Sequence, residues 1–171
     1  KGHASMPPLV SLIDQSDYDP GQVTGAVQRL LAPLGGMAAF VRPGDVVVLQ
    51  PNILAGVPPN RAVTTHPAVV RAVAQLALDC GGRVSVGDSP GVGSLERAAA
   101  KSGIADVVRD LGLSWAPFTP SEVSHPQRLY KTLSVAHELL EADVIINVPK
   151  LKTHGQMLMT LAVKNMFGAV V

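Results

Sequence analysis

Asp143-Val-Ile-Ile-Asn-Val-Pro-Lys-Leu-Lys-Thr-His154 is the stretch of the sequence that decides the fold. Its first part, residues 144–148, is a short run rich in β-branched residues that ends at Pro149. Such a run predicts a strand buried on both faces, as in a parallel sheet. Lys150, Lys152 and His154 then occupy alternate positions, so an extended backbone would direct all three side chains to one side.

Residues 156–167 are apolar at helical spacing, nearly all round the helix axis, which predicts a buried helix. Thr160 and Lys164 would share a face of this helix, with Asn165 one step round. A buried lysine is costly unless an anion pairs with it or it loses its charge. Because three lysines and no acidic residue follow Asp143, we favour a bound anion over acidic groups elsewhere in the fold.

The composition is that of one globular domain. The chain has 171 residues, of which 47% are hydrophobic and 16% charged, which suits a single sizeable core. A net charge of +1 with dispersed lysines and arginines argues against nucleic-acid binding. Apolar runs too short to span a bilayer and the lack of a visible signal peptide predict a cytoplasmic protein without a membrane partner. The single cysteine, Cys80, excludes an internal disulfide and any cysteine-ligated cluster carried by this chain alone.

Both ends of the sequence carry signals of their own. Residues 1–5, ahead of Met6, have the composition of a cloning remnant, which leaves residues 6–171 as a single α/β domain. The last residues, 167–171, are apolar and have no polar finish. We therefore expect the chain to be a fragment of a longer protein.

Strand and helix patterns alternate along the rest of the chain. Strands are expected over residues 9–13, 46–50, 84–87, 113–118 and 129–135, with a polar loop over residues 119–127. Helices are expected over residues 20–34, 67–80, 95–101, 104–111 and 137–141. This alternation predicts a mostly parallel, doubly wound, Rossmann-like sheet with helices on both faces.

Ligands of open parallel sheets bind outside the carboxyl ends of the strands. Three loops with unusual residues follow predicted strands here, at Pro51-Asn52, residues 88–94 and residues 150–154. The loop Gly87-Asp-Ser-Pro-Gly-Val-Gly-Ser94 leads into a helix, where its glycines and free N–H groups suit an anion. It lacks the lysine of a Walker A loop and the third glycine of a dinucleotide fingerprint. A tight turn capped by Ser94 explains it equally well.

The candidate site residues come from these loops and from the helix predicted after them. We predict His154 and Lys164 as catalytic, although about 14 Å would separate them along the helix axis. A ligand of nucleotide size could bridge that distance. The predicted ligand-binding residues are Asn52, His66, Asp88, Ser89, Lys150, Lys152 and Asn165. For His66 the alternative is a capping role at a helix start, and for Lys164 a side chain that reaches solvent. One histidine among lysines is a poor set of metal ligands, so no metal site is predicted.

Several of these segments together resemble the domain-of-unknown-function family 362 (DUF362). The resemblance rests on Pro51-Asn52, residues 64–73, Gly87-Asp-Ser-Pro-Gly91, Val-Pro-Lys-Leu-Lys-Thr-His154 and Ala-Val-Lys-Asn-Met-Phe-Gly168. It runs from Met6 onward and implies an α/β domain without an established activity. Members are often joined to a ferredoxin-like module that binds four-iron clusters, so a cluster is implied only for a full-length protein. Gln50 stands where members commonly carry a lysine.

His154 and Lys164 are also similar in spacing to two residues of the nickel-pincer lactate racemases. In those enzymes a loop histidine precedes by ten positions a lysine that holds the nucleotide-derived cofactor. The similarity implies nickel or a nucleotide-derived cofactor. The glycine-rich sequence between the two residues is replaced here by residues 156–163.

The sequence thus predicts a domain that binds an anionic substrate or a phosphate-bearing cofactor at the carboxyl edge of its sheet. It would act within a redox or isomerising enzyme, with His154 as acid, base or ligand and the lysines neutralising charge. The alternative is a non-catalytic domain that binds a ligand or docks a ferredoxin-like module or redox partner. A third possibility is a structural unit whose lysine-rich loop contacts another subunit.

Overall fold

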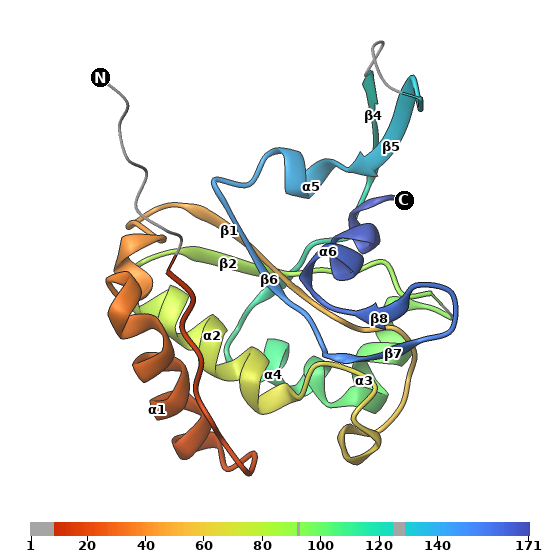
Figure 1. The fold of residues 1–171 in the computed structure, drawn as a ribbon. Coiled ribbons are helices and arrows are strands. Elements are labelled where there is room, and N and C mark those ends of the chain that lie inside the picture. The colour runs from red at the N-terminus through yellow and green to blue at the C-terminus, as the bar shows by residue number, and fades with distance from the viewer. Residues whose placement is uncertain (1–8, 92, 125–128) are drawn as a thin grey trace, which may run out of the picture.

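The computed structural model describes residues 9–91, 93–124 and 129–171, so the expected remnant at residues 1–5 lies outside the described part. Its main body is an all-parallel sheet in the order β3-β2-β1-β6 (Figure 1). The strands are β1 (Val46–Pro51), β2 (Arg83–Val86), β3 (Ser114–Trp115) and β6 (Val144–Val148). The α/β class is confirmed, and so is the parallel pairing of the three strands that bear the candidate loops.

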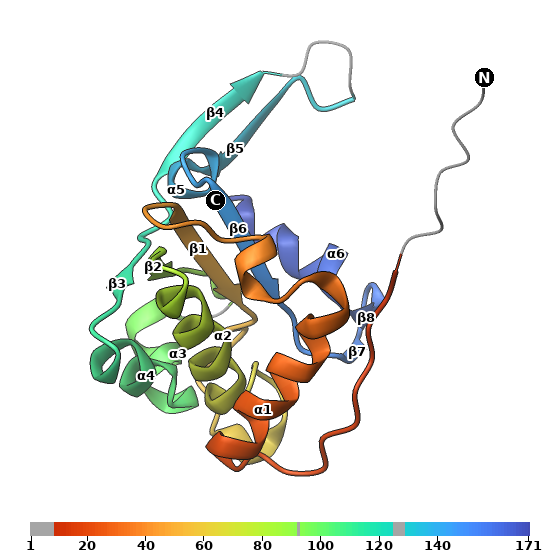
Figure 2. The same ribbon diagram turned by 90° about the vertical axis from the view of Figure 1, so that its left-hand side faces the viewer.

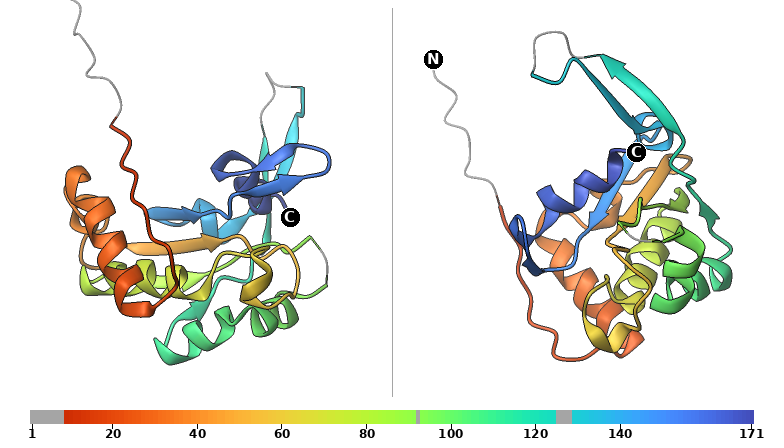
Figure 3. Two further views of the ribbon diagram at one scale, coloured as in Figure 1. Left: turned by 60° about the horizontal axis from the view of Figure 1, so that its bottom comes forward. Right: turned by 90° about the vertical axis from the view of Figure 1, so that its right-hand side faces the viewer.

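Helices flank this sheet on both sides, but unequally (Figure 3). The longer helices lie on one face and are α1 (Pro20–Leu31), α2 (Pro67–Asp79), α3 (Leu95–Ser102) and α4 (Ile104–Asp110). The other face carries the short α5 (His137–Leu140) and α6 (Ala162–Asn165). Short 3₁₀ turns cover Ala32–Leu34, Met37–Ala39, Pro59–Arg61 and Met166–Ala169.

Residues of β1 alternate between the two faces, as the pleat of a strand requires. Val47 and Leu49 pack into the larger core with side chains of α2 and α4. Val48 packs on the opposite face with residues that include Leu139 and Ala169. Gln50 follows Val48 by two positions and therefore faces the α6 side, next to the carboxyl edge of the sheet.

Two antiparallel hairpins complete the fold. β4 (Pro120–Ser124) pairs with β5 (Thr132–Ala136) in a ribbon that projects from the body of the sheet (Figure 2). β7 (Lys152–His154) pairs with β8 (Leu158–Thr160) beside α6. The prediction of a polar loop over residues 119–127 is therefore wrong where β4 lies. A two-stranded ribbon with exposed faces can form from polar residues, without the alternation of apolar residues that marks a half-buried strand.

Two further strand predictions need correction. Residues 9–13 form no strand, because no neighbouring strand pairs with them in the described chain; Leu9 and Leu12 are exposed. Residues 144–148 do form a strand, but it lies at the sheet edge, with Ile145 40% exposed, so it is not buried on both faces.

The buried helix predicted over residues 156–167 is also wrong. Pairing of β8 with β7 takes its first half, and helix begins only at Ala162. Leu158 and Val163, expected inside, are exposed. An apolar run at helical spacing is not enough to form a helix when a neighbouring strand offers a backbone partner.

Candidate functional site

The chain after β1 is held by a buried threonine, Thr65. The Asn52 N–H donates to Thr65 Oγ1 (2.9 Å), and the Thr65 N–H donates to the Asn52 carbonyl oxygen (3.1 Å). Thr65 Oγ1 in turn donates to the carbonyl oxygen of Val148, at 2.6 Å. These bonds tie the ends of β1 and β6 to the start of α2. They fix the backbone of Asn52 and leave its side chain for the space outside the sheet.

Asp88, two residues after the end of β2, is a buried carboxylate at the same edge, only 5% exposed. Its Oδ2 accepts from the Ile53 N–H at 2.7 Å. Burial raises the pKa of Asp88 to about 6, although hydrogen bonds from Ile53, Ser89 and Gln50 and the charge of Lys152 favour the ionised form. The group therefore changes charge close to neutral pH.

Two glycines allow the backbone to pack closely around Asp88. At Gly87 an added Cβ would collide with the Phe118 ring and lie 2.8 Å from the Ala116 carbonyl oxygen. At Gly168 it would collide with Asp88 Oδ1. The residue before Asp88 and the turn that covers it must therefore both lack a side chain.

The hairpin β7–β8 turns one face toward this edge. Lys152 and Thr160 are paired across the two strands, and His154 lies two positions along from Lys152, so the three share a face. The Lys152 ammonium donates to the Val63 carbonyl oxygen at 2.6 Å. Burial lowers the pKa of Lys152. The charges of Lys164 and Lys150 lower it further, whereas the charge of Asp88 raises it.

His154 accepts two backbone hydrogen bonds at Nδ1, from the N–H groups of Gln156 and Met157, each at 3.2 Å. These bonds close the hairpin turn. In the neutral imidazole they require the proton on Nε2, so Nε2–H is the group that His154 can offer as a hydrogen-bond donor.

Asn165 docks α6 on the sheet. Its Nδ2 donates to the Gln50 carbonyl oxygen (3.2 Å) and to Asn147 Oδ1 (2.8 Å), and Gln50 Nε2 donates back to the Asn165 carbonyl oxygen (3.2 Å). Lys164, one residue earlier, lies over the Phe167 ring, with its Nζ 4.9 Å from the ring centroid. Neither Lys152 nor Lys164 forms an ion pair with a described carboxylate.

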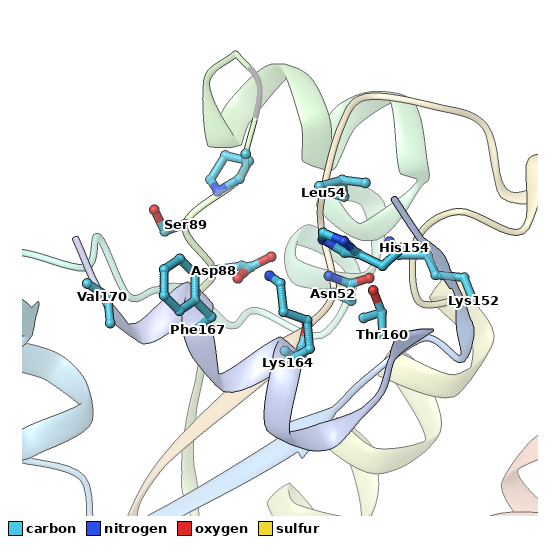
Figure 4. A pocket seen from close by; sticks show the side chains of 14 residues that line it. Asn52, Leu54, Asp88, Ser89, Lys152, His154, Thr160, Lys164, Phe167 and Val170 are labelled. Atoms are coloured by element: carbon cyan, nitrogen blue, oxygen red, sulfur yellow. The ribbon is translucent and has the colours of Figure 1, made fainter. Parts of the chain in front are cut away.

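These elements enclose a cavity of about 330 Å³. It is lined by Asn52, Leu54, Asp88, Ser89, Pro90, Gly91, Lys152, His154, Thr160, Lys164, Asn165, Phe167, Gly168 and Val170. Figure 4 shows Lys164 directed toward Asp88, with Asn52, Thr160 and His154 gathered beside them. Of the predicted site residues, the structure thus brings seven together: Asn52, Asp88, Ser89, Lys152, His154, Lys164 and Asn165. His154 and Lys164 line the same cavity because the hairpin β7–β8, and not one continuous helix, lies between them.

His66 and Lys150 are not among the residues that line this cavity. His66 Nδ1 accepts from the Ala68 N–H (3.2 Å) and caps α2, while its ring stacks on Tyr18 with centroids 3.7 Å apart. Burial and the charge of Lys150 lower the pKa of His66. The capping role weighed for His66 accounts for its contacts.

Similarity to known proteins assigns the chain to a family. Residues 47–171 match the family model described as "Domain of unknown function (DUF362)". The chain belongs to this family. It is also 42% identical over 161 residues to "Thylakoid-associated protein sll1697" from Synechocystis sp. (strain ATCC 27184 / PCC 6803 / Kazusa). That match covers 94% of this chain and 50% of the relative, so the chain spans half of the relative's length. No solved structure matches the chain.

Membership of DUF362 leaves the implied cofactors as predictions. A four-iron cluster does not fit the residues present, because the chain has one cysteine, Cys80, and a cluster is held by several thiolates. Among the described residues, no group of three or more His, Cys, Asp and Glu side chains could hold a metal ion. In the same part of the chain, no helix has the length and apolar character needed to cross a membrane.

Two polar residues, one lining the DUF362 cavity and one buried beside it, are not predicted as site residues by the sequence patterns. The sequence pattern places Thr160 on a helix face, whereas strand pairing opposite Lys152 brings it to the cavity. Gln50 is distinctive in the sequence only as the replacement for a lysine, yet it is fully buried beside Asp88. A polar residue ending an otherwise apolar strand is the signal that could have found Gln50.

Proposed function

We propose that this DUF362 domain binds a small anionic ligand, either a substrate or a phosphate-bearing cofactor, at the carboxyl edge of its sheet. One observation carries the proposal: Lys152 and Lys164 line one cavity, and neither has an ion pair with a described carboxylate. Partly buried ammonium groups that form no ion pair favour an anion between them. The Nε2–H of His154 adds a neutral donor to the same space.

The charge of the cavity depends on Asp88. With Asp88 ionised, one carboxylate opposes Lys152 and Lys164; with Asp88 protonated, both lysine charges are available to a ligand. Because burial raises the pKa of Asp88 to about 6, the affinity for an anion should rise as the pH falls through that value. Bound anion should in turn raise the Asp88 pKa further.

Asp88 is also the group best suited to proton exchange with a bound ligand. A carboxyl with a pKa near neutrality can take up and return a proton at physiological pH. Lys164 and His154 would stabilise the negative charge that develops on the ligand. In this proposal the reaction is an isomerisation or another acid–base step; a redox reaction would need a partner that supplies electrons.

Calorimetric titration at low ionic strength tests the anion site, with phosphate, pyrophosphate and citrate as probes. We expect Lys152→Met and Lys164→Met each to weaken binding of the tightest probe about ten-fold or more. Lys101→Met, at an exposed lysine of α3 that does not line the cavity, is the matched control and should bind as the wild type does.

The proposal fails if no probe binds more tightly to the wild type than to the double variant of Lys152 and Lys164. It also fails if Lys101→Met weakens binding as much as either cavity variant. Repeating the titration at pH 5 and pH 8 tests separately whether protonation of Asp88 raises the affinity for an anion.

A second function, docking to a partner, is favoured by exposed apolar side chains around the cavity. Met157, Leu158, Val163 and Phe167 are 60%, 85%, 90% and 64% exposed. A redox partner or a ferredoxin-like module could cover these side chains if the protein is cytoplasmic, as the sequence predicts. The name of the relative associates that protein with thylakoids. If docking is the function, Leu158→Glu should abolish co-purification of the partner from native lysate, and anion binding should persist.

A further inference from the structure

The cavity presents buried oxygen atoms as well as cations. Asn52 Oδ1, Thr160 Oγ1 and Asn165 Oδ1 have no hydrogen-bond partner among the described residues. The three residues are only 9%, 3% and 3% exposed, and all three line the cavity. Buried polar atoms in native proteins are almost always hydrogen-bonded, so these oxygens indicate a ligand with groups that complement them.

Asn52 is the best placed of the three to select a ligand. Its backbone is fixed by Thr65, whereas its side-chain amide makes no hydrogen bond to the described protein. Asn165 differs, because its Nδ2 is already committed to Gln50 and Asn147. Figure 4 shows the Asn52 amide beside the Thr160 hydroxyl and below the His154 ring.

A hydroxyl group fits this corner better than any other donor. It can donate to Asn52 Oδ1 and accept from the Thr160 hydroxyl or from His154 Nε2–H, so the Asn52 oxygen and the Thr160 hydroxyl can both find a partner. An ammonium group could donate as well, but Lys152 and Lys164 would repel it.

We propose that the ligand of the proposed anion site, on which this inference rests, is a hydroxylated anion: a hydroxy acid or a phosphorylated polyol. Its negative group lies against Lys152 and Lys164, and its hydroxyl lies against Asn52 and Thr160. A cavity of about 330 Å³ suits such a small molecule.

Calorimetry with matched ligand pairs tests this assignment. Glycerol 3-phosphate is compared with propyl phosphate, and glycerate with propionate, so that each pair differs in hydroxyl groups and the two pairs distinguish phosphate from carboxylate. We expect the hydroxylated member of at least one pair to bind about ten-fold or more tightly, because the deoxy analogue leaves buried oxygens unpaired.

Two variants locate the preference. Thr160→Val keeps the side-chain shape, and Asn52→Leu keeps the approximate volume. Each should reduce the preference for the hydroxylated ligand to about three-fold or less without weakening the binding of the deoxy ligand. Thr153→Val is the matched control, because Thr153 is exposed on the opposite face of the hairpin. Thermal unfolding checks that each variant is folded, and Thr160→Val alone decides the test if Asn52→Leu is not.

The outcomes separate this inference from the function on which it rests. If both members of each pair bind equally, water satisfies the oxygens, the inference is overturned and the anion site stands. If a hydroxyl preference survives Thr160→Val unchanged, the corner is wrongly assigned. If no anion of either kind binds, the proposed function fails and the inference fails with it.

Discussion

The two walls of the cavity are built in opposite ways. The sheet wall, residues 50–54 and 87–91, follows β1 and β2, and its Gln50 and Asp88 are 0% and 5% exposed. The cap wall, residues 150–170, consists of the hairpin β7–β8, α6 and the turn after it, and its Leu158 and Val163 are 85% and 90% exposed. The sheet wall carries the carboxylate and the Asn52 amide, and the cap wall carries the lysines.

The difference separates folding from binding. Groups in the sheet wall are set by the same hydrogen bonds that hold the sheet together, so changing them disturbs the fold. Most side chains of the cap wall are exposed or half-buried, and such segments open at lower cost than the core. Substitutions in the sheet wall should therefore lower stability, except at Asp88, whose buried charge is itself a cost, and those at exposed positions of the cap wall should mainly alter binding.

The largest contrast is expected from two glycine substitutions. Gly87→Ala, in the sheet wall, should lower the free energy of unfolding by about 3 kcal/mol, because its Cβ meets Phe118 and lies 2.8 Å from the Ala116 carbonyl oxygen. Gly155→Ala, in the cap hairpin, has nothing within 4 Å of its Cβ and should change it by less than about 0.5 kcal/mol. Urea titration measures both. Equal losses would mean that the two walls are equally packed.

The next contrast comes from the pH dependence of Asp88. Its pKa is raised to about 6 in the folded protein, so the native state holds its proton more tightly than the unfolded chain, where the carboxyl has its ordinary pKa of 3.8. Stability from this group is therefore highest below pH 4, falls as the pH rises toward 6 and stays low above it. Burial outweighs the hydrogen bonds from Ile53, Ser89 and Gln50 and the charge of Lys152, all of which favour ionisation of Asp88.

Asp88→Asn removes this cost. We expect the variant to match the wild type in stability at pH 4 and to exceed it by as much as about 3 kcal/mol at pH 8. Asp79→Asn, at an exposed carboxyl, is the control. A variant less stable than the wild type at pH 8 would show that the Ile53 and Ser89 bonds to the ionised carboxylate outweigh its burial.

Sequence patterns predicted the sheet wall better than the cap wall, for the same physical reason. Residues 46–50 and 84–87 are apolar strands between amphipathic helices, and local periodicity is enough to assign them. Capping groups also act locally: Asp19 Oδ1 accepts from the Gln22 N–H at 3.0 Å, where the start of α1 was expected. The carboxyl-edge loops then converge because parallel strands end at one edge.

The cap wall depends on contacts that local patterns do not contain. Whether residues 158–160 extend or coil is decided by pairing with residues 152–154, and the apolar side chains gave a misleading helical pattern. The docking of α6 rests on Asn165 and Gln50, which are 115 positions apart. The lysines could be predicted as members of one site, but the geometry that joins Lys164 to His154 could not.

A smaller effect should come from the bonds that join the two walls. Asn165→Ala removes the hydrogen bonds to Gln50 and Asn147, and we expect a loss of about 1–2 kcal/mol in the free energy of unfolding. Amide hydrogen exchange should accelerate in β7, β8 and α6 more than in β1, because the cap opens first. Asn60→Ala, at an exposed site, is the control. Uniform acceleration in both walls would mean that the cap is not a separate unit.

The smallest effect distinguishes a bare cap from a covered one. Val163→Thr, at a side chain 90% exposed on α6, should change the free energy of unfolding by less than about 0.5 kcal/mol. The same substitution at Val48, 1% exposed in the core behind α6, places a hydroxyl among apolar groups and should cost about 1–3 kcal/mol. Urea titration at several protein concentrations measures both. A loss at Val163 that grows with concentration would mean that two copies cover this surface, and the cap wall would then contribute to assembly as well as to binding.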